Sequence, residues 1–229
     1  PLMNKSLGAW SWKLLVFVVV LQCELLFIRK VSDLKPGTSN WIEKAEQILN
    51  FQIPTDNFYG PGSALLLAPF VLLGVSTYLA NHFYFALGAI AYWHLCRTIP
   101  SRTGSAIALL ALPANFYLIW LIVFSQDTVC EFFLLAWSVL FLTRQRIGLF
   151  AVTGFILCET RAGYWVFYLG ISGILFMRTY LKQRRVALGK LFAVYFLLGS
   201  SIFNVINYGS PSPALEGGLT AYFGYTKYH

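Results

Sequence analysis

The chain has 229 residues, of which 58% are hydrophobic and only 11% are charged. A soluble domain carries roughly 25% charged residues, so this composition excludes an ordinary water-soluble domain and indicates a protein surrounded by lipid. The formal net charge of +8 does not indicate a nucleic-acid partner. The basic residues form short clusters between apolar runs instead of a continuous stripe, as the positive-inside rule for membrane proteins expects.

Seven apolar segments follow one another along the chain, and about twenty apolar residues cross the hydrocarbon core of a bilayer. The segments are residues 14–28, 61–96, 104–124, 128–143, 147–158, 162–177 and 187–206. They predict an all-α fold, a polytopic transmembrane helix bundle with about seven net crossings, in a single transmembrane domain over residues 1–229. The segment 61–96 is long enough for one crossing or two, so the topology depends on it.

The distribution of charge favours one net crossing for residues 61–96. With one crossing, one side of the membrane collects eleven of the 17 basic residues and none of the nine acidic residues. These basic residues are Lys5, Lys13, Arg97, Arg102, Arg144, Arg146, Arg178, Lys182, Arg184, Arg185 and Lys190. By the positive-inside rule that side is cytoplasmic. We therefore expect a cytoplasmic N-terminus, an outer C-terminus, and a partial or re-entrant helix over residues 61–74 before one full span. A bacterial inner membrane and an endoplasmic reticulum both fit this pattern.

Two segments outside the membrane are predicted to be ordered. Residues 29–60 form the first outer loop and contain an amphipathic helix, which we expect to lie in the interface plane. Its apolar positions are Trp41, Ile42, Ala45, Ile48 and Leu49, and its opposite face carries Glu43, Lys44, Glu46 and Gln47. Residues 208–229 form an outer C-terminal tail that is rich in aromatic residues, so we expect it to pack on the outer surface or on a partner.

Charged residues at the outer ends of the spans are candidates for function, because a charge in the middle of the membrane costs about 2.5–3.5 kcal/mol. Asp127 and Glu131 lie four residues apart, on one face of the helix that opens the 128–143 span, where like charges repel. Such a pair attracts a cation or an arginine. Glu159 and Arg161 stand together in the next outer loop. These residues fit either an anion-handling site, with Arg161 on a phosphate and a carboxylate as base, or a structural ion network.

The four cysteines show no spacing typical of a metal site. Cys23, Cys96, Cys130 and Cys158 stand alone inside or beside apolar segments. We expect them to be small hydrophobic residues of the core, and we assign no metal-binding residues from the sequence.

The order of several short motifs resembles the membrane module of the polytopic GT-C glycosyltransferases, which include protein O-mannosyltransferases and the lipid A aminoarabinose transferase. The motifs are Trp41 to Leu49, Tyr59 to Gly74 with its Tyr-Gly-Pro-Gly start and its Leu-Leu-Leu-Ala-Pro run, Ala111 to Pro113, Ser125 to Asp127, Glu159 to Arg161, and Asn207 to Gly209. The similarity that these motifs mark extends over nearly the whole chain.

The resemblance implies transfer of a hexosyl or pentosyl group from a polyprenyl-phosphate donor to an acceptor on the non-cytoplasmic face. It implies Asp33 as the catalytic base, with Asp127 as a second catalytic group, and arginine or a divalent cation to stabilise the leaving phosphate. The substrate-binding residues that it implies are Tyr59, Pro61, Glu131, Glu159 and Arg161.

Two differences from the family keep a second hypothesis open. Asp33 lies eight residues before Trp41, whereas the family usually places its acid closer to the aromatic residue. Family members also usually continue with further spans, so we expect a truncated relative, half of a split enzyme, or a descendant without catalysis. The alternative to a transferase is therefore a non-catalytic transmembrane subunit of a larger membrane complex that keeps a transferase-like scaffold.

Overall fold

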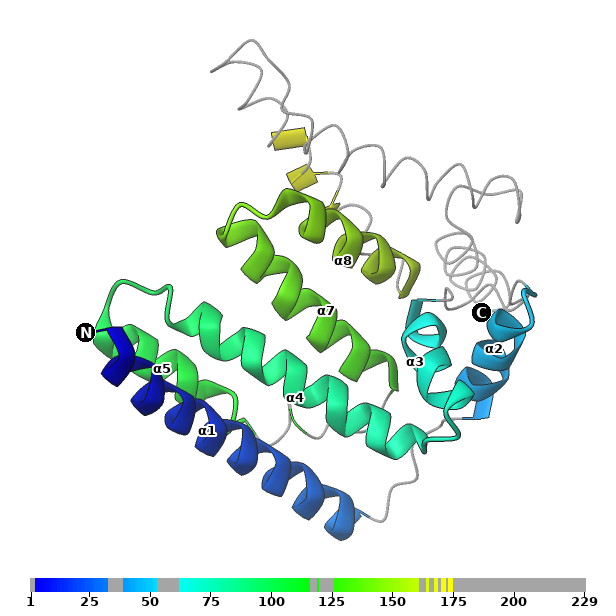
Figure 1. The fold of residues 1–229 in the computed structure, drawn as a ribbon, viewed down its shortest axis with the longest axis horizontal. Helices are drawn as coiled ribbons and strands as arrows, with labels where there is room; N and C mark the ends of the chain where they lie inside the picture. Colours follow the sequence, from blue (N-terminus) through cyan, green and yellow to red (C-terminus); the bar gives the residue numbers. More distant parts are fainter. Residues whose placement is uncertain are drawn as a thin grey trace, which may run out of the picture. The chain divides into compact units, whose positions relative to one another are not determined.

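The computed structural model describes residues 3–32, 39–52, 62–115 and 126–160, with single positions at 119, 164, 167, 168, 170, 171, 173 and 174. Every regular element in these ranges is a helix, in agreement with the predicted all-α fold (Figure 1). The helices are α1 (Met3–Ser32), α2 (Ser39–Leu49), α3 (Gly62–Leu72), α4 (Thr77–Cys96), α5 (Arg102–Ala111), α7 (Gln126–Thr143) and α8 (Ile147–Thr160).

The helices form two compact units. Unit 1 comprises Pro1–Thr38 and Val75–Leu140 and contains α1, α4, α5 and most of α7. Unit 2 comprises Ser39–Gly74 and Phe141–His229 and contains α2, α3 and α8. Within the described ranges, none of the helices is by itself both long and apolar enough to cross a membrane, whereas α3 and α4, joined at a bend, meet that requirement as a pair.

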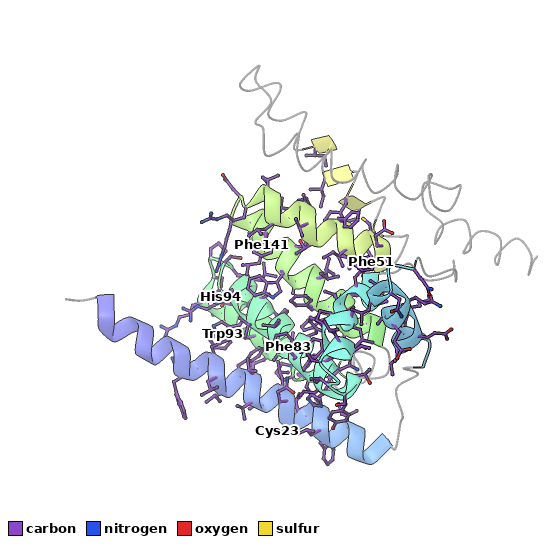
Figure 2. The ribbon with its side chains drawn as sticks, turned by 45° about the vertical axis from the view of Figure 1, so that its right-hand side comes forward. Cys23, Phe51, Phe83, Trp93, His94 and Phe141 are labelled. Carbon is purple, nitrogen blue, oxygen red and sulfur yellow. The ribbon has the colours of Figure 1, made fainter. Side chains whose placement is uncertain are left out.

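In unit 1, α1 and α4 pack against each other and run antiparallel. Near the start of α4, His82 Nδ1 lies 2.5 Å from Gln22 Oε1, and Gln22 Nε2 donates to the backbone oxygen of His82 at 3.0 Å. Phe17, earlier in α1, packs on Tyr92 and Trp93, later in α4, with ring centroids 6.5 and 5.2 Å apart. Figure 2 labels Trp93 and His94 toward the end of α4 and Cys23 on α1.

By contrast, α7 runs parallel to α4. Tyr84 packs on Phe133 with ring centroids 5.1 Å apart, and further along both helices Ala91 shares a buried cluster with Ala136 and Leu140. Later residues of α4 therefore meet later residues of α7. A parallel pair needs a returning connection, and α5 begins it. It follows α4 after a short turn, and the Tyr92 hydroxyl donates to the backbone oxygen of Ala108.

A glycine allows α4 and α7 to approach closely. A Cβ at Gly88 would lie 2.5 Å from the ring of Phe132 and 3.3 Å from the Cα of Phe133. One residue earlier, the backbone oxygen of Leu87 accepts a hydrogen bond from Trp137 Nε1 at 3.0 Å. The absence of a side chain at Gly88 thus allows the short distance between the axes of α4 and α7.

In unit 2, α3 contacts both α2 and α8. One side of α3 is buried, and its buried residues are Gly62, Ser63, Ala64, Leu67 and Ala68. On α8, Gly154 makes room for the ring of Tyr168, which also packs on Phe150 with centroids 5.0 Å apart.

The predicted amphipathic helix is present, but one of its residues was assigned to the wrong face. Trp41 and Ala45 of α2 are buried as expected, and Glu43 and Glu46 are exposed. Lys44, predicted on the exposed face, is only 5% exposed. Its ammonium group lies 4.7 Å from the centre of the Trp41 ring, a cation–π geometry, so its side chain follows the apolar face of the helix.

The prediction for the cysteines is wrong for one of the four. Cys96, Cys130 and Cys158 are buried, whereas Cys23 is exposed. It belongs to an exposed stripe along α1 that also includes Leu15, Val19, Leu26 and Phe27. The opposite stripe of α1 buries Leu21, Leu25 and Ile28.

Three helices end in a residue with left-handed backbone geometry. Gly74 has φ 64° after α3, and Phe51 and Gln145 have φ 57° after α2 and α7. Around Phe51, the amide of Gln52 donates to the oxygen of Gln47 at 2.8 Å, and around Gln145 the amide of Arg146 donates to the oxygen of Phe141 at 2.8 Å. Such caps satisfy the last carbonyl groups of a helix and usually contain glycine.

We expect Phe51→Gly and Gln145→Gly each to raise the free energy of unfolding by about 1 kcal/mol, because both side chains are exposed and the left-handed geometry is unfavourable for them. Gly74→Ala is the matched control with the opposite sign. A Cβ at Gly74 has no atom within 4 Å, so its effect is conformational only. Thermal unfolding in detergent measures all three, and a loss of stability in both glycine variants would contradict the assignment.

Candidate functional site

The first residue of α3 lies directly against the last turn of α8. A Cβ at Gly62 would collide with the backbone oxygen of Ile156 and the hydroxyl of Thr160, and would lie 2.6 Å from the amide nitrogen of Thr160. Only glycine fits at this position. In the chain, Ser63 follows Gly62 on α3, and Glu159 precedes Thr160 on α8.

Ser63 carries a buried hydroxyl in the first turn of α3. The residue is 0% exposed, and its Oγ has no hydrogen-bond partner among the described residues. A buried hydroxyl without a partner costs about 1–3 kcal/mol. The first amide groups of α3 also have no acceptor within the helix, and the N-terminus of a helix carries a partial positive charge. These general properties of a helix start make the first turn of α3 a candidate for binding an anionic group.

Two charged side chains are buried in the same unit. Glu159 is 5% exposed at the end of α8, and Lys44 is 5% exposed on α2, which packs against α3. Thr160 is also buried, and its hydroxyl donates to the backbone oxygen of Ile156 at 2.9 Å. Buried charges are retained where they have partners or function. We refer to Gly62, Ser63, Glu159 and Thr160 as the α3-start site.

The α3-start site combines groups of opposite hydrogen-bonding character. The hydroxyl of Ser63 and the first amides of α3 donate to anionic oxygens such as those of a phosphate. The carboxylate of Glu159 only accepts hydrogen bonds, so it suits a hydroxyl group. A sugar phosphate presents both kinds of partner, because its phosphate accepts and its hydroxyls donate.

In unit 1, polar and basic side chains lie at opposite ends of the helices. The end where α4 and α7 begin and α1 finishes carries Gln22, Asn81, His82 and Glu131, and both Asn81 and Glu131 are buried. Asn81 is 5% exposed and its Oδ1 has no hydrogen-bond partner among the described residues. The opposite end carries the exposed Lys13, Arg97 and Arg102.

The predicted site residues divide into three groups. Asp33, Tyr59, Pro61 and Arg161 lie outside the described residues. Asp127 belongs to the first turn of α7, and its side chain lies outside the described part. Glu131 is buried in unit 1 and Glu159 is buried in unit 2. Glu159 lies in the last turn of α8, which contacts the start of α3, and Pro61 directly precedes α3 in the chain.

Sequence reasoning missed Ser63 and the burial of Lys44. The available signal for Ser63 was a small polar residue directly after Pro61-Gly62 at the start of an apolar helix. Among the described residues, no group of three or more His, Cys, Asp or Glu side chains is arranged to hold a metal ion. The divalent cation that the family resemblance implies stays a prediction.

Comparison with known proteins gives no relative for this chain. No protein-family model, no curated protein and no solved structure matches it.

Proposed function

We propose that this chain is a multi-pass membrane protein that binds a polyprenyl-phosphate sugar and transfers the sugar to an acceptor on the non-cytoplasmic face, in the manner of GT-C glycosyltransferases. One observation carries the proposal. At the α3-start site, the buried Ser63, whose hydroxyl has no hydrogen-bond partner among the described residues, lies in the first turn of α3, and this turn contacts the end of α8 that carries the buried Glu159. This pairing of a donor with an acceptor suits a phosphate joined to a sugar.

The helix directions of unit 1 support the membrane location. α1 and α4 are antiparallel, α5 returns, and α7 runs parallel to α4. This alternation is what the predicted topology requires if residues 61–96 cross once in net terms. The exposed basic residues Lys13, Arg97 and Arg102 share one end, which is the cytoplasmic end under the positive-inside rule.

The roles of the residues follow from their chemistry. Ser63 and the first amides of α3 bind the phosphate of the donor, with Arg161 as its cationic partner. Glu159 accepts a hydrogen bond from a hydroxyl of the sugar or the acceptor. Asp33, in the first outer loop, removes the proton of the acceptor hydroxyl, while Asp127 and Glu131 belong to the polar end of unit 1. Tyr59 and Pro61 precede α3 and shape the approach to it.

The test of the α3-start site is binding of farnesyl phosphate to the purified full chain in detergent. We expect farnesyl phosphate to raise the melting temperature, and we expect farnesol, which lacks the phosphate, to leave it unchanged. Ser63→Ala is expected to weaken binding about tenfold, which corresponds to about 1.4 kcal/mol. Thr153→Ala is the matched control, because it removes a hydroxyl of α8 that bonds only to backbone oxygens of its own helix. Equal affinity of Ser63→Ala and Thr153→Ala would contradict the assignment.

A second experiment distinguishes the transferase from the non-catalytic subunit. Native mass spectrometry of the protein released from its own membrane detects bound lipid and bound protein together. A mass that matches a polyprenyl phosphate supports the transferase, and Asp33→Asn should then abolish sugar transfer while farnesyl phosphate still binds. A stoichiometric protein partner without such a lipid would instead identify a structural subunit.

A further inference from the structure

The exposed side of α3 is apolar along its full length. Opposite the buried residues of this helix lie Leu65, Pro69, Leu72 and Leu73, at the spacing of one helical stripe. Leu72 and Leu73 are 71% and 74% exposed. We call these four residues the α3 stripe.

The exposed side of α2 has the opposite character. Glu43, Glu46 and Asn50 are exposed, while Trp41 and Ala45 are buried. Because α3 is the helix that packs against α2, the apolar side of α2 is already covered by protein. The two helices therefore present a charged surface from α2 and an apolar surface from α3, which is the amphipathic pattern of a structure at a membrane interface.

The length of α3 limits what can cover its stripe. An eleven-residue helix rises about 16 Å, roughly half of the 30 Å hydrocarbon core. Gly74 follows with φ 64° and ends the helix. The stripe contains no charged or hydrogen-bonding side chain, so it matches acyl chains in one leaflet better than water or headgroups.

We infer that α3, and not α2, is the element of this region that inserts into lipid. The α3 stripe contacts the acyl chains of one leaflet, and Glu43 and Glu46 of α2 lie toward water. This inference rests on the membrane location in the proposed function. It replaces the expectation that the apolar face of α2 lies in the interface plane.

The experiment places an environment-sensitive fluorescent label on single cysteines of the full chain in phosphatidylcholine–phosphatidylglycerol nanodiscs. The native Cys23 on α1 is exposed, whereas Cys96, Cys130 and Cys158 are buried and stay unlabelled in the folded protein. Leu72→Cys and Glu43→Cys are made in a Cys23→Ser background, with Leu73→Cys as a second reporter for the stripe. Brominated lipids quench labels in the acyl layer, and iodide quenches labels in water.

We expect brominated lipid to reduce the emission at position 72 at least twofold, with little effect of iodide, and the reverse at position 43. The label on native Cys23 should respond to brominated lipid. If iodide quenches the labels at positions 72 and 73 while brominated lipid quenches the label at Cys23, the inference is overturned and the membrane location stays intact. Iodide quenching at all of these positions would overturn the membrane location itself. Protection of 72 and 73 from both quenchers would overturn the inference in favour of a protein partner on the stripe.

Discussion

Gly62→Ala is expected to lower the free energy of unfolding by about 3 kcal/mol, at the upper end of the range for overpacking, and to abolish farnesyl phosphate binding. The reason is the nature of the atoms that the added methyl group would meet. They include the backbone oxygen of Ile156 and, at 2.6 Å, the backbone nitrogen of Thr160. Backbone atoms of a helix cannot rotate away, so α3 and α8 must separate. Separation also moves the first turn of α3, which carries Ser63, away from the last turn of α8.

Gly148→Ala is the control for this substitution. Gly148 lies in the first turn of α8, and a Cβ there meets no atom within 4 Å. Alanine has a higher helix propensity than glycine, so stability should stay equal or rise slightly and binding should not change. Chemical unfolding in detergent and the melting-temperature shift with farnesyl phosphate measure both effects. Wild-type stability in Gly62→Ala would show that α3 does not contact α8 at this point.

Gly88→Leu is expected to destabilise unit 1 by about 3 kcal/mol, whereas Gly88→Ala should cost less than about 1 kcal/mol. The nearest atoms to a Cβ at this position belong to the ring of Phe132, at 2.5 Å. A side-chain ring can move, so one methyl group is tolerated. The next neighbour is the Cα of Phe133, at 3.3 Å. This backbone atom cannot move alone, so a larger side chain must force α4 and α7 apart.

A double substitution tests this explanation of the Gly88 effect. Removing the ring with Phe132→Ala creates space beside position 88. The loss caused by Gly88→Leu should therefore be smaller in the Phe132→Ala background than in the wild type, with a coupling of about 1 kcal/mol for two residues in contact. Additive losses in thermal unfolding would mean that the leucine is excluded by something other than Phe132.

The sequence predicted most of the helices well and the contacts between them poorly. The apolar run 104–124 is the exception, because α5 ends at Ala111 and a turn follows over residues 112–114. The apolar runs 14–28, 128–143 and 147–158 lie within α1, α7 and α8, and the partial helix expected over residues 61–74 is α3. These predictions succeed because apolar run length and Gly/Pro positions are local properties. The number of membrane crossings and the sugar-transfer activity stay predictions.

The candidate site could not be located in this way because it depends on which helices touch. Periodicity assigned Lys44 to an exposed face, since it treats a helix as isolated, whereas Lys44 follows Trp41 and is buried in unit 2. Ser63 is one polar residue in an apolar run, and it becomes notable only because it is buried next to Gly62, which contacts Thr160. Asp127 and Glu131 stood out as charges, but charge alone does not say which neighbour a carboxylate meets.

The parallel pairing of α4 and α7 has a consequence for biosynthesis. α4 ends at Cys96 and α7 begins at Gln126, so the side of α4 that contains Gly88 and Ala91 has no α7 to cover it until further residues are made. At about 5–20 residues per second, the thirty-residue interval lasts roughly 2 to 6 s. During that time this side of α4, with Asn81 and the small residues Gly88 and Ala91, stays uncovered and can contact other proteins. If the chain enters a membrane as proposed, we expect the insertion machinery or a chaperone to cover this face, and substitutions there should lower the yield of folded protein in cells more than they lower the stability of the finished molecule.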